Sequence, residues 1–169
     1  DYINADLKLA VCADPNCTST TVSIIDSDDY TGTYSSVTIG IDGNPIISFY
    51  DASNGILKIA ACTNSTCTSS IKSIVDPTSN VGIFSSVAIG SNGYPIVSYY
   101  DSDNGVLRLA TCEDPTCTSS IINVVDNTGN VGLFTSIAVG ANGNPIVSYH
   151  DVSFGDLKVA SCSDPRCAT

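Results

Sequence analysis

The sequence repeats with a period of 50 residues, and this period constrains the fold more than any other feature. The cysteines fall into two registers that each advance by 50 without an insertion or a deletion. The first register holds Cys12, Cys62, Cys112 and Cys162, and the second holds Cys17, Cys67, Cys117 and Cys167. Such a period is typical of repeat architectures, in which each unit buries its surface against its neighbours. The 169 residues therefore need not share one central core.

One unit of the repeat divides into four predicted β-strands. Four short segments rich in Val, Ile and Tyr are each bounded by turn residues, a pattern typical of strands joined by hairpins. In one unit they are Ser86–Gly90, Pro95–Asp101, Val106–Cys112 and Ser120–Asp126. Consecutive hairpins predict an antiparallel meander. No useful length of sequence has the apolar spacing of an amphipathic helix, so we expect almost no helix.

The connections between these strands carry residues suited to tight turns. Asn92-Gly93 joins the first and second strands, and Asn104-Gly105 joins the second and third. Glycine readily accepts the positive φ that tight hairpin turns require. Pro95 then begins the second strand, where its missing N–H costs no ladder hydrogen bond. The turn chemistry therefore agrees with the four-strand division.

Both faces of each predicted strand carry large apolar side chains. In 46–50, Ile46 and Tyr50 alternate with Ile47 and Phe49. A free antiparallel sheet would show one polar face, so these sheets are expected to be covered on both sides. The predicted fold class is all-β, with tandem four-stranded antiparallel blades that form a β-propeller-like array, either closed or open and partial.

The units do not add up to a whole number of blades. The chain is predicted to be a single repeat array over 1–169, with a partial blade at 1–26, whole blades at 27–76 and 77–126, and a partial blade at 127–169. Closed propellers generally use four to eight blades. The chain is therefore a segment of a longer array, a subunit whose end blades are completed by neighbours, or an open fibrous stack. Head-to-tail strand addition that does not close makes a filament.

Each unit carries a Cys-x4-Cys motif between its third and fourth strands: CADPNC, CTNSTC, CEDPTC and CSDPRC. Four intervening residues, three times with Asp-Pro, suit a type I turn, and cysteines flanking it are predicted to face each other across the ladder and form a disulfide. Zinc is the alternative, but zinc sites usually use closer cysteine pairs, and His150 is the sole histidine. Each bridge is expected to contribute less than about 3 kcal/mol and to lock the hairpin against fraying.

Charge and cysteine content restrict the location and the partners. The net charge of −11 repels nucleic acid and anionic membranes, and no apolar run is long enough for a membrane span. No signal segment opens the chain, so we expect a mature or excised form. Paired cysteines favour an extracellular or cell-surface protein. Asn16 and Asn64 begin glycosylation sequons, which are short enough to arise by chance.

Catalytic chemistry finds little support in the sequence. His150 occupies the phase of Tyr50 and Tyr100, and Glu113 is the sole glutamate. No nucleophile motif, paired glutamates or phosphate loop appears, so we predict no catalytic residue and no cofactor, and an enzyme is a distant third hypothesis. Tyr50, Tyr100 and His150 lie next to turns and are the candidates for a sugar-stacking surface, with core packing as the alternative.

Charged residues also recur in phase. Aspartates end the second and fourth strands, at Asp51, Asp101 and Asp151 and at Asp26, Asp76 and Asp126. They suit either calcium, helped by Asp28 and Asp29, or turn stabilisation, which we favour. Four of the six basic residues share one phase, at Lys8, Lys58, Arg108 and Lys158. We expect each to lie over the facing aromatic ring or to pair with a neighbouring aspartate.

The pattern GNPIVSYYD…NGxLKxAxC…DPxC, read from Asn144 to Cys167 and in its copies, resembles the repeats of large secreted bacterial proteins. Their units are taken to form sialidase-like or lectin-like β-propeller blades. The resemblance implies a blade fold and an extracellular role. It does not imply sialidase activity, because the Ser-x-Asp-x-Gly-x-Thr-Trp box, tryptophan and an arginine cluster are all missing from the sequence.

Two non-enzymatic hypotheses follow. The first is a structural and interaction module of a secreted adhesin or extracellular fibre, whose partners are copies of itself or adjacent repeats. The second is a lectin-like module with repeated equivalent glycan sites.

Overall fold

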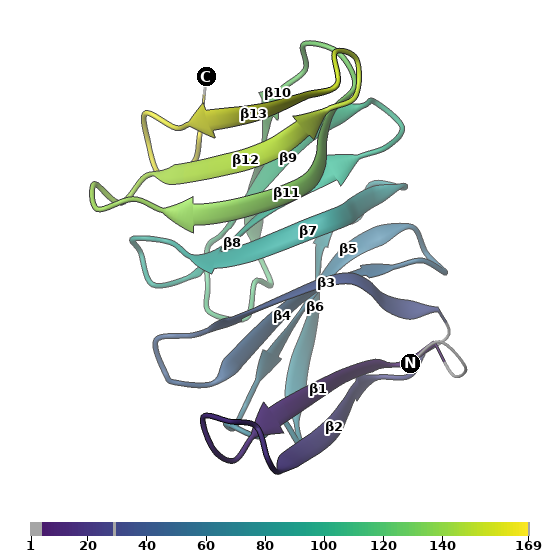
Figure 1. Cartoon of the computed structure of the whole chain (residues 1–169), viewed down its shortest axis with the longest axis vertical. Helices are drawn as coiled ribbons and strands as arrows, with labels where there is room; N and C mark the ends of the chain where they lie inside the picture. The colour runs from purple at the N-terminus through teal and green to yellow at the C-terminus, as the bar shows by residue number, and fades with distance from the viewer. Residues whose placement is uncertain (1–4, 29, 169) are drawn as a thin grey trace.

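The computed structural model describes residues 5–28 and 30–168, which form thirteen β-strands and no helix. The strands make four antiparallel sheets in chain order (Figure 1). The first sheet contains β1 (Leu7–Cys12) and β2 (Thr20–Asp26). The second contains β3 (Thr31–Ile39), β4 (Pro45–Asp51), β5 (Ile56–Cys62) and β6 (Ser70–Asp76). The third contains β7 (Val81–Ile89), β8 (Pro95–Asp101), β9 (Val106–Cys112) and β10 (Ser120–Asp126), and the fourth contains β11 (Val131–Val139), β12 (Pro145–Asp151) and β13 (Asp156–Ser161).

The predicted fold class is confirmed, because the sheets are antiparallel meanders in tandem and form an open array. The sheet with β1 lies at one end of this array and the sheet with β13 at the other (Figure 1). Within the described residues, no helix is long and apolar enough to cross a membrane.

The first strand of each unit differs from its prediction. We expected it to begin at Ser86, but β7 begins at Val81. Its pairing with β8 shifts twice, between Val81 and Ile83 and between Ile83 and Ser86, and Phe84 has a φ of 57°. These bulges interrupt the alternation of side chains, so the usual period-2 pattern begins only after them. The bounds of β8, β9 and β10 agree with the prediction.

Aspartates hold the turns that follow the second strand of each sheet. In the third sheet, the carboxylate of Asp101 accepts hydrogen bonds from the backbone N–H of Asn104 at 3.1 Å and from its side-chain amide at 2.8 Å. Gly105 then turns the chain with a φ of 66°. Asp51 and Asn54 make the same pair of bonds one unit earlier. The favoured turn-stabilising role is thus present in the structure.

The first strands of successive sheets lie beside one another. β7 contacts β3 on one side and β11 on the other. Neighbouring sheets approach each other closely at Gly82, where a Cβ atom would lie 2.8 Å from the Cα of Leu57 in the preceding sheet. Gly132 meets Leu107 at the same 2.8 Å. Because no larger residue fits there, glycine at this phase permits the sheets to pack.

The core lies between the sheets. Leu57 and Ile59 on β5 pack with Val87 and Tyr99 of the third sheet. One unit later, β9 packs in the same way against the fourth sheet. Buried hydroxyls link the layers as well, as in the hydrogen bond of 3.0 Å between Ser48 and Ser85. Both faces of the third sheet are therefore covered, which explains why its strands are apolar on both sides.

Candidate functional site

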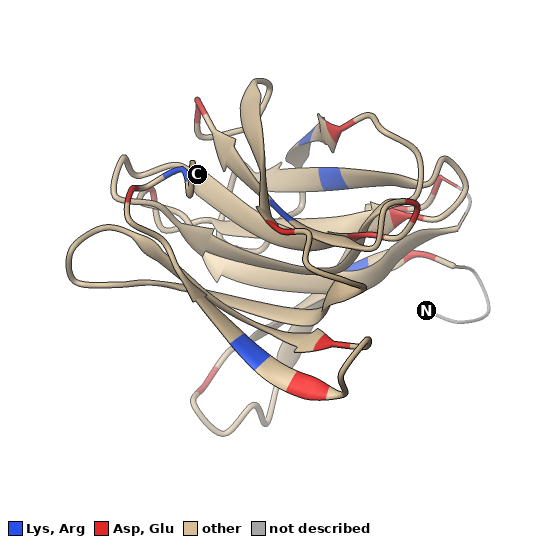
Figure 2. Cartoon of the chain, turned by 90° about the horizontal axis from the view of Figure 1, so that it is seen from above, with Lys and Arg blue, Asp and Glu red and all other residues tan. Residues whose placement is uncertain are grey.

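The cations that share one phase join neighbouring sheets. Arg108 on β9 lies 2.6 Å from Asp101 in its own sheet and 3.1 Å from Asp76 in the preceding sheet. Lys158 does the same with Asp151 at 2.8 Å and Asp126 at 3.3 Å. Figure 2 shows such basic positions on the strands, with acidic positions near the strand ends and in the loops. Pairing with aspartate is therefore the main arrangement, and these charges hold the array together.

The cation at Lys58 combines both predicted arrangements. It pairs with Asp51 at 3.1 Å and lies 5.8 Å from the ring centroid of Phe49. It also approaches Asp26 of the first sheet at 3.6 Å. The same phase thus carries an ion pair and a contact over an aromatic ring in the second sheet.

Tyrosines complete two of these contacts. The hydroxyl of Tyr149 donates to Asp126 at 2.7 Å, and that of Tyr99 donates to Asp76 at 2.8 Å. Burial, followed by the hydrogen bond to Asp126, raises the pKa of Tyr149. Burial alone would also raise the pKa of Asp126, but hydrogen bonds led by those from Thr128 outweigh it and lower the pKa to about 2. Asp126 is therefore a carboxylate at neutral pH.

Two of the calcium candidates, Asp26 and Asp28, pair with a lysine. Lys72 donates to Asp26 at 2.9 Å and to Asp28 at 3.5 Å. Asp29 lies outside the described residues. Across residues 5–28 and 30–168, no three His, Cys, Asp or Glu side chains gather as metal ligands would. Lys72 therefore forms ion pairs with both of the described carboxylates of this group.

The cysteines form disulfides between neighbours in each motif. The pairs are Cys12–Cys17, Cys62–Cys67, Cys112–Cys117 and Cys162–Cys167, with Cα–Cα distances of 4.8 to 4.9 Å. We expected the two cysteines of each motif to face each other across the ladder, but they do not. Cys112 pairs with Ser120 in the ladder, while Cys117 closes a turn through its N–H to Asp114 at 3.2 Å and has a φ of 56°.

The disulfides also take part in packing between sheets. Cys112 and Cys117 are fully buried in the core between the second and third sheets. Cys12 and Cys17 are exposed, because no sheet precedes theirs in the described array. The predicted role of locking a hairpin is therefore incomplete, since the later bridges are core residues too.

The candidate stacking residues do not form equivalent surfaces. Tyr100 is buried, and its hydroxyl donates to Asn130 at 2.6 Å. Tyr50 and His150 are half-buried. The ring of Tyr50 lies 6.3 Å from that of Tyr34, and the ring of His150 lies 6.4 Å from that of Phe134. Tyr50 and His150 therefore flank another set of aromatic residues.

That set is an aromatic column of Tyr34, Phe84 and Phe134, one from each of β3, β7 and β11. Neighbouring ring centroids are 4.6 and 4.2 Å apart. All three residues have φ between 51° and 57°, a strained backbone for bulky side chains. Phe134 is 65% exposed. Sequence reasoning missed the column, although its residues recur at an interval of 50.

Two faces of the array expose apolar side chains whose counterparts are buried in the interior, one at the C-terminal end and one beside β1. Leu157 and Val159 on β13 are 79% and 63% exposed, whereas their counterparts Leu107 and Leu109 are fully buried. With Ile146 they form the C-terminal face.

Val37 on β3 is 54% exposed, whereas its counterpart Val87 is 6% exposed. Val37 and Ile39 lie on the second sheet, in an apolar groove of about 400 Å³ beside β1, whose two-stranded sheet has no counterpart of β3 and β4. We call these two residues the N-terminal face. The C-terminal face is thus uncovered because no sheet follows it in the described array, and the N-terminal face is uncovered because the first sheet has no counterpart of the β3 and β4 that cover β7.

Comparison with known proteins supports the fold alone. A crystal structure of a protein of unknown function from Dyadobacter fermentans DSM 18053 resembles the chain with a TM-score of 0.67 at 14% sequence identity. The match covers 88% of this chain and 43% of that chain, so this chain spans less than half the length of its structural neighbour. No protein-family model and no curated protein matches the sequence.

Proposed function

We propose that the protein is a non-enzymatic structural repeat module of a secreted or cell-surface protein, which associates head-to-tail with a second copy through its end faces. The observation that carries this proposal is the exposure of Leu157 and Val159 on β13, whose counterparts in the second and third sheets are fully buried. The four disulfides support an extracellular location. The blade-like stacking of four sheets supports a β-propeller-type array.

The two end faces differ in kind and are suited to each other. In the interior, the third strand of one sheet packs against the first and second strands of the next, as β5 packs against β7 and β8. The C-terminal face offers strands with uncovered apolar side chains, and the N-terminal face offers Val37 and Ile39 on β3, which has β1 beside it but lacks the neighbours that β7 has in β3 and β4. Covering a leucine side chain contributes about 1.5 to 3 kcal/mol. Unlike faces that meet without closing a ring build an open filament, as in an extracellular fibre or adhesin stalk.

Sedimentation velocity over a concentration series tests this proposal. The unmodified protein is expected to form dimers and larger species as its concentration rises. Leu157→Asp should weaken association at least tenfold, because a charge replaces an apolar contact. Ile24→Asp is the matched control, because Ile24 is exposed and its counterparts Ile74 and Val124 are exposed in the interior too. An unmodified protein that stays monomeric throughout would contradict the proposal.

Carbohydrate binding is a second candidate function, and the aromatic column favours it. The exposed ring of Phe134 continues a row of aromatic side chains, and their strained backbone is repeated in three sheets. Strain of this kind is retained where it serves a site or a packing need. Binding to a glycan array that weakens in the Phe134→Ala variant would support carbohydrate binding. A glycan array that shows no binding, either with or without calcium, would contradict it.

A further inference from the structure

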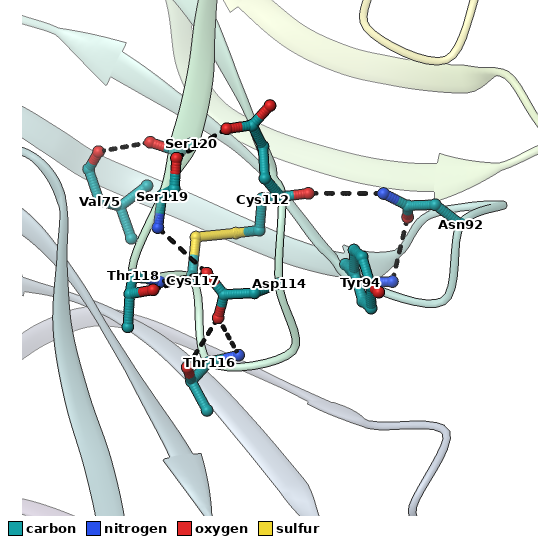
Figure 3. Close-up of a disulfide and its surroundings, with 11 residues drawn as sticks. Val75, Asn92, Tyr94, Cys112, Asp114, Thr116, Cys117, Thr118, Ser119 and Ser120 are labelled. Atoms are coloured by element: carbon teal, nitrogen blue, oxygen red, sulfur yellow. Dashed lines mark hydrogen bonds between the residues drawn. A yellow bond between two sulfur atoms is a disulfide. The ribbon is translucent and has the colours of Figure 1, made fainter.

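A polar groove of about 230 Å³ lies between the third and fourth sheets. Its lining includes Asn92, Tyr94, Thr111, Glu113, Ile121 and Arg166. The turn between β7 and β8 provides the first two, the end of β9 and the residue after it provide the next two, and β10 provides Ile121. Arg166 comes from the last hairpin of the fourth sheet. The groove is therefore assembled from two repeats, and Figure 3 shows its third-sheet side around Cys112.

The same groove recurs 50 residues earlier, between the second and third sheets, with a different lining. Asn44 stands there in place of Tyr94, Thr63 in place of Glu113, and Thr116 in place of Arg166. Ala61 likewise replaces Thr111. The later groove thus has an aromatic ring and a guanidinium that the earlier groove lacks, and its carboxylate is that of Glu113, whereas Asp42 provides the carboxylate of the earlier groove.

The polar groups of the groove have hydrogen-bonding capacity left over. Thr111 is 8% exposed, and its hydroxyl has no hydrogen-bond partner among the described residues. Glu113 accepts a hydrogen bond from Ser119 at 2.7 Å through one carboxylate oxygen, Oε2. Arg166 uses its backbone N–H and C=O, with Asp164 at 2.8 Å and Asn123 at 2.9 Å, and its side chain is exposed. Buried polar groups are normally satisfied, so an unpartnered hydroxyl in a groove wall points to a ligand or water.

We propose that this groove binds a single neutral sugar residue of a glycan. The carboxylate of Glu113 would accept hydrogen bonds from sugar hydroxyls, Arg166 and Asn92 would donate to them, and the ring of Tyr94 would cover the apolar face of the sugar. An anionic ligand is disfavoured by Glu113 and by the net charge of −11, and a cationic one is disfavoured by Arg166. The inference rests on carbohydrate binding as the function and does not depend on self-association.

Amide NMR titration of the full chain with galactose, glucose and mannose tests the groove. We expect at least one of these sugars to shift signals of Tyr94, Thr111 and Glu113. Glu113→Thr, Arg166→Thr and Tyr94→Asn each install the residue that the earlier groove already tolerates, so folding should be preserved. Each should raise the dissociation constant about tenfold or more, and Thr63→Ala in the earlier groove should leave it unchanged.

Other outcomes separate the site from the function. Sugar binding that is lost on Phe134→Ala but kept in the three groove variants would place the site at the aromatic column, which overturns this inference and leaves carbohydrate binding standing. Failure of all three sugars to bind, or tighter binding of galacturonic acid or free glycine, would overturn the inference as well.

Discussion

Phe49 occupies a position that tyrosine holds in the two later sheets, and this single missing hydroxyl leaves a buried carboxylate incompletely bonded. Tyr99 and Tyr149 each donate to an aspartate of the preceding sheet. The corresponding oxygen of Asp26, Oδ2, has no hydrogen-bond partner among the described residues, although Lys58 lies 3.6 Å away. Comparison of the repeats thus shows that the second sheet lacks the tyrosine hydroxyl that donates to this aspartate in the later sheets.

Phe49→Tyr is expected to stabilise the protein. Its hydroxyl would reach Asp26 as its counterparts reach Asp76 and Asp126, and one such bond contributes about 1 kcal/mol to the free energy of unfolding. The reverse change, Tyr99→Phe, should lower that free energy by a similar amount or more, because it leaves Asp76 with fewer donors. Urea denaturation measures both, and a destabilised Phe49→Tyr variant would show that the repeats are not equivalent here.

At the scale of strands and hairpins, the sequence predicted what local chemistry determines. The Asn-Gly turns precede β8 and β9, and the Cys-x4-Cys loop precedes β10, so the bounds of these strands were predicted. The start of β7 was missed because bulges and the left-handed Phe84 hide the alternation. The polar groove was not predicted for another reason. Its distinguishing residues, Tyr94, Glu113 and Arg166, stand at positions where the repeats differ, so the period of 50 residues does not mark them.

The disulfides offer a test of packing at this scale. Removing Cys112–Cys117 or Cys12–Cys17 by paired Cys→Ala changes opens the same short loop, which costs about 2 kcal/mol in the loop-entropy estimate. Cys112 and Cys117 are also buried between sheets, so their removal leaves a cavity and should cost about 1 to 2 kcal/mol more. Denaturation of both variants measures the difference. Equal losses of unfolding free energy in the two variants would mean that the buried disulfide contributes nothing through its packing.

At the scale of the whole molecule, each sheet is stabilised by the sheets on either side. The third sheet has both faces covered, and the exposed side chains of the N-terminal and C-terminal faces are the same residue types that the interior buries. Which side of a sheet faces its neighbour could not be predicted, because both faces of the strands are apolar. The packing of β3, β7 and β11 beside one another settles that question.

The most direct test of the account mixes two variants, Val37→Asp at the N-terminal face and Leu157→Asp at the C-terminal face, and measures the mass in solution by light scattering. Each variant alone should be monomeric, because every copy lacks the same face. An equal mixture should form dimers and nothing larger, because one variant keeps the face that the other needs. A mixture that stays monomeric, or a single variant that associates as strongly as the unmodified protein, would contradict head-to-tail association through the end faces.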